Sequence, residues 1–511
     1  MRLFLQAAVC LIFLSVAASA EEVYLPAKSA TVSSFDETPG WAPPREPKAL
    51  IDGELKTRWA SSSTDAKAAL DIDLGSEATL DSVVINWERA FAKDFNLLVS
   101  TDGRDFKIAT SAKDGKGGRQ TVKFHGPVKA RYLRLETVAK INPEWGISVW
   151  EVEVYGPASD NPKAKTLKDV FPKLAAEIAA PKELKREKPL PGAGELTLSE
   201  YQCGVVLASY SDTELAGPDC DQMLKYLKGI GVDDVSLIVT WYQEKQDSEK
   251  ISPIIEGGNT AREEAVIHAI NEAHKNGLKV MLKPHVDCRD GTFRGNIIAS
   301  DAWFKSYREY ILHYAAVAEE YHVELFAIGC ELENASFDQW KKEWMELIAE
   351  VRKVYHGKLT YAANWTEFET VCFWDQMDFI GIDAYFPLTQ KPEPTQAELN
   401  QGWKTVMAKI SAWKTNQKLN QPLILTEVGY QSADTTNITP WQTGSTKEDQ
   451  AEQAMALEAM FEATKDLPWF KGMYWWNYFP TDVQRPLDYT IKGKKAEEVM
   501  KKWFKLTREG K

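Results

Sequence analysis

Eight apolar runs, separated by segments with helical periodicity, occupy the chain after residue 200 and constrain its fold more than any other feature. The runs are residues 203–209, 234–241, 278–286, 325–331, 358–365, 379–386, 422–430 and 472–479. Helical periodicity is clearest in residues 262–276, 303–321, 337–355, 397–415 and 447–464. Buried parallel strands alternating with helices predict a (β/α)₈ TIM barrel. A doubly wound open sheet is the alternative, but no glycine-rich phosphate loop follows the first run, which disfavours it.

The first part of the chain has a different pattern. Between residues 23 and 157, apolar and polar residues alternate in short runs, with Gly, Asp and Pro between them. The runs are residues 69–74, 81–87, 96–100, 121–124, 131–136 and 150–155. Period two predicts half-buried strands, so we expect an antiparallel β-sandwich over residues 21–157. Residues 158–196, which become charged and rich in Pro and Gly, are expected to link it to the barrel, which we place at 197–511.

Residues 1–20 have the pattern of a signal peptide. Arg2 precedes an apolar run over residues 3–16, and Ala18-Ser19-Ala20 is the small-x-small pattern that signal peptidase recognises. A membrane anchor is the alternative, but the run is shorter than the ~20 residues of a spanning helix. We therefore expect cleavage after Ala20 and a secreted or periplasmic protein without membrane insertion.

Charge and aromatic content narrow the partners. The formal net charge of −13 at pH 7 disfavours nucleic acid as a partner. Aromatic residues make up 11% of the chain, with 18 Trp; most are expected in the core, but such an excess of flat amphipathic rings also suits stacking on a ring-shaped partner. A neutral substrate is consistent with both observations.

Polar and aromatic side chains follow the apolar runs, at the carboxyl ends of strands where TIM barrels place their active sites. Glu331 ends the fourth run and Glu427 lies in the seventh. Two glutamates on opposite sides of a barrel, among aromatic and amide side chains, are typical of glycoside hydrolysis. The sequence contains no nucleophile-elbow serine and no HExxH motif, so we expect catalysis without a cofactor.

Several stretches in this half resemble glycoside hydrolase family 113, in the clan of retaining enzymes with glutamates ending strands four and seven. The stretches are TWYQ at 240–243, GLKVMLKPHVD at 277–287, IGCEL at 328–332, LTYAANW at 359–365, FWD at 373–375, IGIDAYF at 380–386 and LTEVGY at 425–430. The resemblance implies that Glu331 is the general acid/base and Glu427 the nucleophile, with carboxyl groups roughly 5–5.5 Å apart. Cys330 stands where the clan usually has Asn, so we expect another residue to hydrogen-bond the sugar 2-hydroxyl.

Eight other strand-end residues are predicted to bind substrate: Trp241, Lys283, His285, Asn364, Trp365, Tyr385, Trp475 and Trp476. His285 and Asn364 suit hydrogen bonds to sugar hydroxyls, with core packing as the alternative for His285. Adjacent strand residues point to opposite faces, so Trp475 and Trp476 cannot both face inward.

Four polar residues at these strand ends have predicted roles beside the catalytic pair. We expect Tyr385 to donate a hydrogen bond to Glu427, with packing at the barrel mouth as the alternative. Lys283 and Asp287 are expected to form a simple ion pair with each other. Glu333 shares a strand face with Glu331 but lies further out, so we expect a rim or structural role.

The N-terminal part resembles the discoidin domains classed as carbohydrate-binding module family 32. The stretches are ALIDGELKTRWA at 49–60, LDIDLG at 70–75, RYLRL at 131–135 and EVEVYG at 151–156. The resemblance implies a jelly-roll-like sandwich that binds glycans through variable loops. The loop candidates are Trp41, Arg45, Arg89 and Trp145.

The same resemblance implies a structural Ca²⁺ site in the sandwich. Asp52, Thr57 and Glu151 fall where such domains often hold the ion with oxygen ligands.

The sequence thus predicts a secreted, monomeric, retaining glycoside hydrolase that degrades β-linked, mannose-containing polysaccharides. One alternative keeps the chemistry on another β-glycan, such as a glucan, a xylan or an amino-sugar host glycan. Another is a carbohydrate-binding protein on an inactive barrel.

Overall fold

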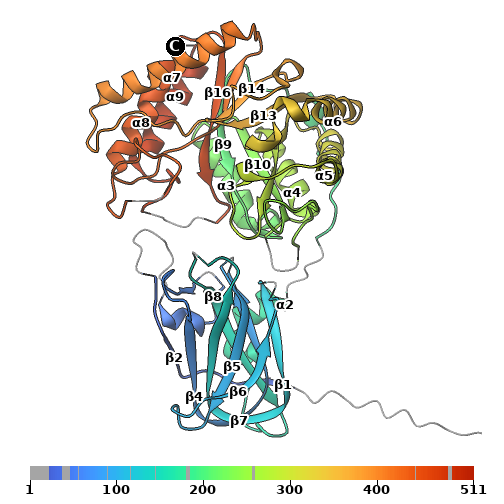
Figure 1. Ribbon diagram of the computed structural model, residues 1–511, viewed down its shortest axis with the longest axis vertical. Helices are drawn as coiled ribbons and strands as arrows, with labels where there is room; N and C mark the ends of the chain where they lie inside the picture. The colour runs from blue at the N-terminus through green and yellow to red at the C-terminus, as the bar shows by residue number, and fades with distance from the viewer. Residues whose placement is uncertain are drawn as a thin grey trace, which may run out of the picture.

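The computed structural model describes residues 22–36, 46–55, 57–88, 90–115, 117–143, 145–179, 184–255, 259–442, 445–481 and 486–510. The expected signal peptide and the loop residues Trp41, Arg45 and Arg89 lie outside these residues. Figure 1 shows an N-terminal body of strands and a C-terminal barrel surrounded by helices. We call them the sheet domain (22–157) and the barrel (201–510).

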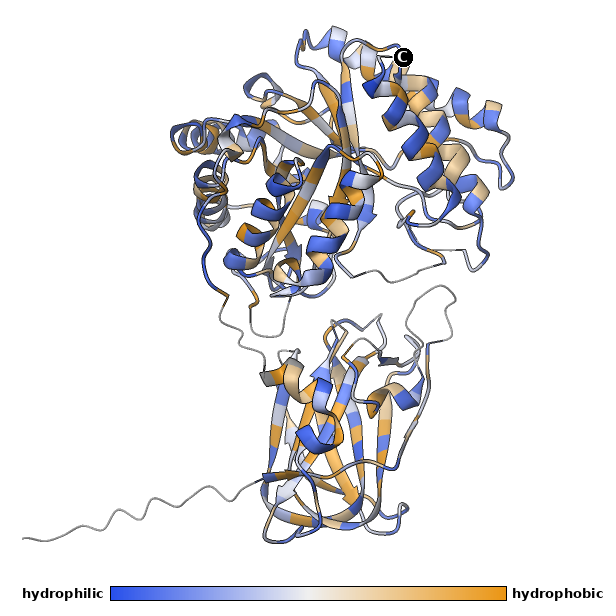
Figure 2. Ribbon diagram, turned by 180° about the vertical axis from the view of Figure 1, so that it is seen from behind, coloured by the Kyte–Doolittle hydropathy of each residue, from blue (hydrophilic) through white to orange (hydrophobic). Residues whose placement is uncertain are grey.

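The sheet domain is an antiparallel eight-stranded sheet, as the period-two runs predict. Its strands are β1 (Glu22–Tyr24), β2 (Ser29–Val32), β3 (Trp59–Ala60), β4 (Ala69–Trp87), β5 (Ala92–Ser100), β6 (Lys107–Ala112), β7 (Arg119–Lys140) and β8 (Ser148–Pro157). The order is β1-β8-β4-β7-β5-β6, with β2 on β4 and β3 on β8. Figure 2 shows hydrophobic and hydrophilic residues alternating along these strands, because one face covers the core and the other meets water.

Two strands are longer than the sequence pattern indicates. The predicted runs 69–74 and 81–87 are parts of one strand, β4, and the runs 121–124 and 131–136 are parts of β7. Register shifts between Asp73 and Ala78 and between Leu80 and Ser82 interrupt the β4–β7 pairing. Such irregularities break the period-two pattern while the strand continues.

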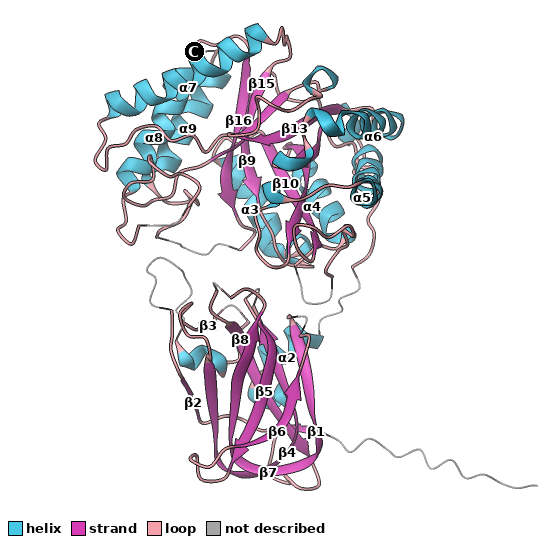
Figure 3. Cartoon of the chain, viewed as in Figure 1, coloured by secondary structure: helices cyan, strands magenta, loops and turns pink. Residues whose placement is uncertain are grey.

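The barrel is closed, parallel and eight-stranded, as predicted. Its strands are β9 (Gln202–Leu207), β10 (Asp234–Gln243), β11 (Lys279–Cys288), β12 (Leu325–Cys330), β13 (Lys358–Asn364), β14 (Ile380–Asp383), β15 (Leu423–Val428) and β16 (Phe470–Tyr478). The helices are α3 (Pro218–Gly229), α4 (Glu263–Lys275), α5 (Asp301–Glu320), α6 (Lys341–Val354), α7 (Gln396–Asn416), α8 (Gln450–Thr464) and α9 (Lys495–Arg508). Figure 3 shows these helices outside the ring of strands.

Side-chain alternation divides the barrel residues between two cores. Residues such as Ile238, Met281, Ile424 and Tyr474 form a small core inside the barrel, while their strand neighbours pack outward against the helices. The strict alternation of strand and α-helix fails at one connection. Between β13 and β14 the chain forms the 3-10 turn η7 (Trp374–Gln376).

The connecting segment packs against both bodies. Helices α1 (Leu167–Val170) and α2 (Pro172–Ala179) adjoin the sheet domain, where Phe171 meets Tyr24 with ring centroids 5.9 Å apart. Glu187 contacts His268 of α4, and its carbonyl oxygen accepts a hydrogen bond from the Tyr321 hydroxyl. Much of the predicted linker is therefore packed on one domain or the other.

The two bodies also touch beside the barrel mouth. Asn142 Nδ2 donates to the carbonyl oxygen of Asp290 at 2.9 Å. Gly291 lies so close to Trp145 that a Cβ there would be 2.9 Å from the indole Cζ2. Asp290 and Gly291 belong to the loop between β11 and α5, so the sheet domain contacts a loop of the active-site face. In the described residues, no helix is long and apolar enough to cross a membrane.

Candidate active site

A cavity of about 560 Å³ opens at the carboxyl ends of the barrel strands. Its lining residues are Tyr210, His285, Phe293, Arg294, Glu331, Glu333, Asn364, Trp365, Thr366, Tyr385, Glu427, Trp441, Trp476 and Tyr489. Both glutamates singled out from the sequence therefore reach one cavity.

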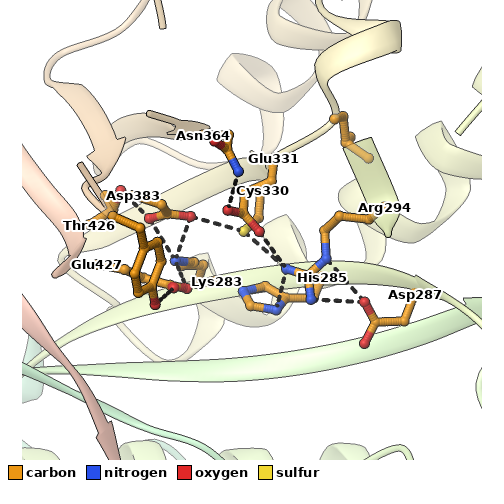
Figure 4. Close-up of polar contacts among 12 residues, drawn as sticks. Lys283, His285, Asp287, Arg294, Cys330, Glu331, Asn364, Asp383, Thr426 and Glu427 are labelled. Carbon is orange, nitrogen blue, oxygen red and sulfur yellow. Dashed lines mark hydrogen bonds and ion pairs between the residues drawn. The ribbon is translucent and has the colours of Figure 1, made fainter. Parts of the chain in front are cut away.

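Glu427 on β15 is buried and held by two donors. Lys283 Nζ lies 2.5 Å from Oε1, and the Tyr385 hydroxyl donates to Oε2 at 2.6 Å. The register of β15 against β16 shifts between Leu425 and Val428, beside Glu427. Figure 4 shows Glu427 next to the Lys283 ammonium.

Lys283 is completely buried and is anchored by a second carboxylate. Its Nζ lies 3.2 Å from Asp383 Oδ1, which also accepts a hydrogen bond from the Thr426 hydroxyl at 2.7 Å. The pKa of Lys283 is raised, because Asp383 and Glu427 outweigh the opposing effect of burial. Lys283 thus keeps a positive charge beside Glu427.

Glu331 follows β12 directly and has an unusual backbone conformation. Its φ of +52° lies in the left-handed region that residues with a Cβ rarely adopt. Such strain persists only where surrounding contacts enforce it, and it is common at active sites. Here the Glu331 amide donates to the Ala362 carbonyl at 2.8 Å.

The Glu331 carboxyl group meets an amide and a guanidinium. Asn364 Nδ2 donates to Oε1 at 2.8 Å, and Arg294 Nη1 lies 3.7 Å from Oε2. The Thr366 backbone amide donates to Asn364 Oδ1 at 3.1 Å, and the Thr366 hydroxyl, whose one hydrogen also faces the nearer Glu333 carboxylate, lies 2.9 Å from the same oxygen. The backbone donor orients the Asn364 amide so that its NH₂ group faces Glu331.

The two glutamates have unequal electrostatic surroundings. Burial raises the pKa of both, and Asp383 adds to the rise. At Glu427 the Lys283 ammonium and the Tyr385 hydroxyl oppose it through direct hydrogen bonds, whereas the pKa of Glu331 is held well above its usual range. Of the two carboxyl groups, Glu331 therefore holds a proton more tightly, and Glu427 ionises more readily.

Cys330 lies between the two carboxyl groups. Its sulfur is within 4.8 Å of an oxygen of Glu427 and of an oxygen of Glu331. Burial raises the pKa of the thiol well above its ordinary value, so it stays protonated, and it donates to Asp383 at 3.3 Å. His285, Cys330 and Glu427 bring possible ligand atoms within 4.8 Å of one another, as do Cys330, Glu331 and Asp383, and the ammonium of Lys283 already pairs with Asp383 and Glu427.

Aromatic residues form the walls of the cavity. Trp365 and Trp441 are stacked, with centroids 5.2 Å apart and planes 24° from parallel. Trp441 is 45% exposed, and Phe293 is 44% exposed. The peptide bond between Trp476 and Asn477 is cis. Exposed aromatic faces at a cavity can stack on sugar rings.

Five of the eight predicted substrate-binding residues line the cavity: His285, Asn364, Trp365, Tyr385 and Trp476. Trp241, Lys283 and Trp475 do not. Trp241 points outward and stacks on Tyr310 at 4.7 Å, and Trp475 donates from Nε1 to the Tyr489 carbonyl. Strand alternation explains why Trp241 and Trp475 do not face the cavity, because the residues next to them in each strand take the inward positions.

The expected pairing of Lys283 with Asp287 is corrected. Lys283 is used entirely by Glu427 and Asp383, while Asp287 pairs with Arg294 at 2.8 Å. The expected hydrogen bond from Tyr385 to Glu427 is present. Glu333 lies at the cavity rim, where the Thr366 hydroxyl bonds to it.

The sequence reasoning missed six cavity residues: Tyr210, Phe293, Arg294, Thr366, Trp441 and Tyr489. All six lie outside the barrel strands, in segments without a regular period. The positions of Phe293 and Arg294, a few residues after His285, are the one signal that could have indicated them.

The proposed calcium ligands lie together in the sheet domain. Thr57 Oγ1 donates to Asp52 Oδ2 at 2.7 Å, and the Gly53 amide donates to Glu151 Oε2 at 2.9 Å. Glu151 Oε1 is buried and has no hydrogen-bond partner among the described residues. Burial and the neighbouring Asp52 raise the pKa of Glu151 to about 9. A buried carboxylate with a free oxygen suits a cation.

Known proteins resemble both parts of the chain. The model of Glycoside Hydrolase Family 113 matches residues 209–494, and the model of the F5/8 type C domain matches residues 29–152. A solved structure of a family 113 β-1,4-mannanase is 27% identical and has a TM-score of 0.54. The match covers 60% of this chain and 99% of the mannanase chain.

Two further relatives differ in how much they share. The family 113 β-mannanase of Alicyclobacillus acidocaldarius, solved in complex with ManMIm, is 30% identical with a TM-score of 0.54. The match covers 61% of this chain and 99% of that β-mannanase. A polysaccharide lyase 8 family protein of Enterococcus faecalis is 30% identical over 88 residues, which are 17% of this chain and only 6% of that relative.

Proposed function

The chain belongs to Glycoside Hydrolase Family 113, and we propose that it cleaves β-linked, mannose-containing glycans with retention at the anomeric carbon. The observation that carries this proposal is the unequal pairing of two buried glutamates. Glu427 is held by Lys283 and Tyr385, whereas Glu331 faces an amide and a more distant guanidinium. A retaining enzyme needs one ionised and one protonated carboxyl group.

The reaction follows from these protonation states. Glu427 attacks the anomeric carbon while Glu331 gives its proton to the leaving oxygen, which breaks the glycosidic bond and forms a glycosyl ester. Glu331, now ionised, then takes a proton from the water that displaces Glu427. Lys283 and Tyr385 aim the Glu427 carboxylate, and Asn364 holds Glu331 from the other side.

The choice of sugar is supported by the relatives and by the cavity. Both solved family members are named β-mannanases, and nearly their whole length aligns with this chain. The stacked Trp365 and Trp441 and the exposed Phe293 offer apolar faces to sugar rings. A neutral glycan that extends beyond one sugar fits such a cavity.

A substrate panel tests the proposal. The full chain would be incubated with β-mannan, β-glucan, xylan and chitin oligosaccharides, with products separated by chromatography and the first anomer identified by NMR. We expect cleavage of β-mannan oligosaccharides with the β-anomer appearing first. The α-anomer first would overturn retention, and turnover of another glycan alone would overturn the sugar. Binding without turnover would favour the non-catalytic alternative.

For the sheet domain we propose glycan binding, supported by its match to the F5/8 type C domain and its contact with an active-site loop. We also propose a Ca²⁺ site at Asp52, Thr57 and Glu151. The ion would supply the positive charge that the partnerless Glu151 oxygen lacks.

We further propose that the protein is exported as a monomer. The signal-peptide pattern of residues 1–20 supports export. Amino-terminal sequencing of the exported protein should begin at Glu21, and light scattering should give the mass of one chain. Retention of residues 1–20 or a stable dimer would contradict the proposal.

A further inference from the structure

Arg294 occupies a central place in the site although no motif of the sequence marks it. It lies in the loop between β11 and α5, and its side chain is 12% exposed. Nε and Nη2 both approach Asp287 Oδ1, at 3.0 and 2.8 Å. Asp287 thus fixes one edge of the guanidinium and leaves Nη1 to face the reacting groups.

Nη1 meets three residues of the site. It lies 2.9 Å from His285 Nδ1, 3.2 Å from Cys330 Sγ and 3.7 Å from Glu331 Oε2. Figure 4 shows the guanidinium between Asp287 on one side and His285 and Glu331 on the other.

The contact with His285 determines where the imidazole carries its proton. A guanidinium can only donate, so Nδ1 must accept and the neutral ring carries its hydrogen on Nε2. Burial, Arg294 and Lys283 lower the pKa of His285 well below its ordinary value, so the ring stays neutral.

The other ring nitrogen is available to substrate. His285 lines the cavity and is 1% exposed, and its Nε2 has no hydrogen-bond partner in the part of the chain that the structure describes. A buried N–H without a partner is costly, so a ligand oxygen should satisfy it. Nε2 lies on the side of the ring that faces Lys283 and Glu427 (Figure 4).

The contact with Glu331 acts at the moment of proton transfer. When Glu331 gives up its proton, a negative charge appears in a buried site near Asp383 and Glu427. Lys283 is engaged by those two carboxylates, so among the described residues Arg294, whose Nη1 lies 3.7 Å from Oε2, is the cation placed to face Glu331.

On the basis of the proposed hydrolase function, we propose that Arg294 is a positioning residue. Its guanidinium holds His285 in the tautomer that donates from Nε2 to a hydroxyl oxygen of the bound sugar. The same group stabilises the carboxylate that Glu331 becomes after protonating the leaving group.

The first experiment reads the tautomer by ¹⁵N NMR of histidine-labelled protein, with the His285 signals assigned by their loss in His285→Gln. The wild type should show a hydrogen on Nε2, none on Nδ1 and no protonation between pH 5 and 8. In Arg294→Gln the ring should titrate or change tautomer. A hydrogen on Nδ1 of the wild type would overturn the proposal. This readout needs no turnover, so it stands if the substrate assignment fails.

The second experiment measures the pH dependence of kcat/KM. The groups that face Glu331 are Asp383 on β14, Glu427 on β15, Lys283 on β11, Asn364 on β13, Cys330 on β12 and Arg294. Removing the guanidinium makes ionisation of Glu331 harder, so the basic limb of the profile should move up by roughly one to three pH units in Arg294→Gln. Arg294→Lys should keep the limb near the wild-type value but raise KM, because one ammonium cannot hold both Asp287 and His285.

Arg352→Gln is the matched control for loss of an arginine. Arg352 pairs with Asp378 at 2.7 Å on the outside of the barrel. Its loss should leave the pH profile and the His285 signals unchanged. An unmoved basic limb in a folded Arg294→Gln protein, judged by near-UV circular dichroism, would overturn the role at Glu331. If Arg294→Gln does not fold, the KM of Arg294→Lys and the tautomer of His285 in the wild type test the proposal instead.

Discussion

Glu151 in the sheet domain and the pair Glu331 and Glu427 in the barrel are all buried, but the groups around their carboxyls differ. Glu427 in the barrel is paired with Lys283, and Nη1 of Arg294 lies 3.7 Å from Glu331 Oε2. At Glu151 in the sheet domain we find no lysine or arginine partner within the described ranges, and burial beside Asp52 raises its pKa to about 9. The barrel therefore places cations beside Glu331 and Glu427, whereas Glu151 relies on a proton or an ion from solution, unlike its neighbour Glu153, which pairs with Arg119.

The largest expected effect tests the barrel side of this comparison. Glu331→Gln and Glu427→Gln should each lower kcat by about three orders of magnitude or more while folding stays intact, because each loses a charge role and keeps its shape. Azide should rescue Glu427→Ala and give the inverted anomer, since a small anion can replace the missing carboxylate. Glu350→Gln, which removes a surface partner of Arg308, is the control. Near-normal turnover in Glu427→Gln would refute the nucleophile.

The second prediction removes the internal cation. Lys283→Met leaves Glu427 and Asp383 without their shared ammonium, so unfolding free energy should fall by about 3–5 kcal/mol. The pKa of Glu427 should rise, and the acidic limb of the kcat/KM profile should move to higher pH because the nucleophile must be ionised. Lys414→Met removes a buried lysine that donates to the Gln421 carbonyl oxygen and lies over the Trp469 ring, and should leave the profile in place. An unmoved acidic limb in Lys283→Met would show that Lys283 does not hold Glu427 ionised.

The third prediction separates the two bodies. A chain that begins at residue 184 keeps the segment packed on α4 and should retain turnover on short oligosaccharides within about threefold. On polymers it should lose about tenfold or more, because a tethered binding domain raises local concentration. Loss on short substrates would mean that the contact of Asn142 and Trp145 with the β11–α5 loop supports catalysis, and Trp145→Ala in the full chain should then reproduce it.

The smallest effect concerns the sheet domain alone and is read as a melting temperature. At a Ca²⁺ concentration 100 times Kd the domain should gain about 2.7 kcal/mol, and chelation should remove the gain. Activity on short oligosaccharides should survive chelation.

The pH dependence of that stability has a definite sign. Because the pKa of Glu151 is raised from 4.5 to about 9, the metal-free domain should lose stability as pH rises through this window, and Ca²⁺ should oppose the loss. Glu151→Gln should remove both dependences. If the melting temperature is the same with and without Ca²⁺ at every pH, the proposed Ca²⁺ site is wrong.

The sequence by itself determined the barrel, the antiparallel domain and the two glutamates. A strand that is buried on both faces has an apolar sequence, so the eight predicted strands lie close to those observed. Glu331 and Glu427 stand at the carboxyl ends of strands, and these ends converge in a barrel. Alternation also indicated that one of Trp475 and Trp476 faces inward, and Trp476 is the one that lines the cavity.

Only the tertiary structure decided which side chains share a charge or a proton. Lys283 reaches Glu427 across 144 residues of sequence, and Arg294 enters the site from a loop without a period. The contact between Asn142 and Asp290 likewise joins residues 148 apart. The alternation of buried and exposed positions along a strand is visible in that strand's own sequence. The conformation of a loop and the partner of an ion pair depend on residues that come together only when the whole barrel closes.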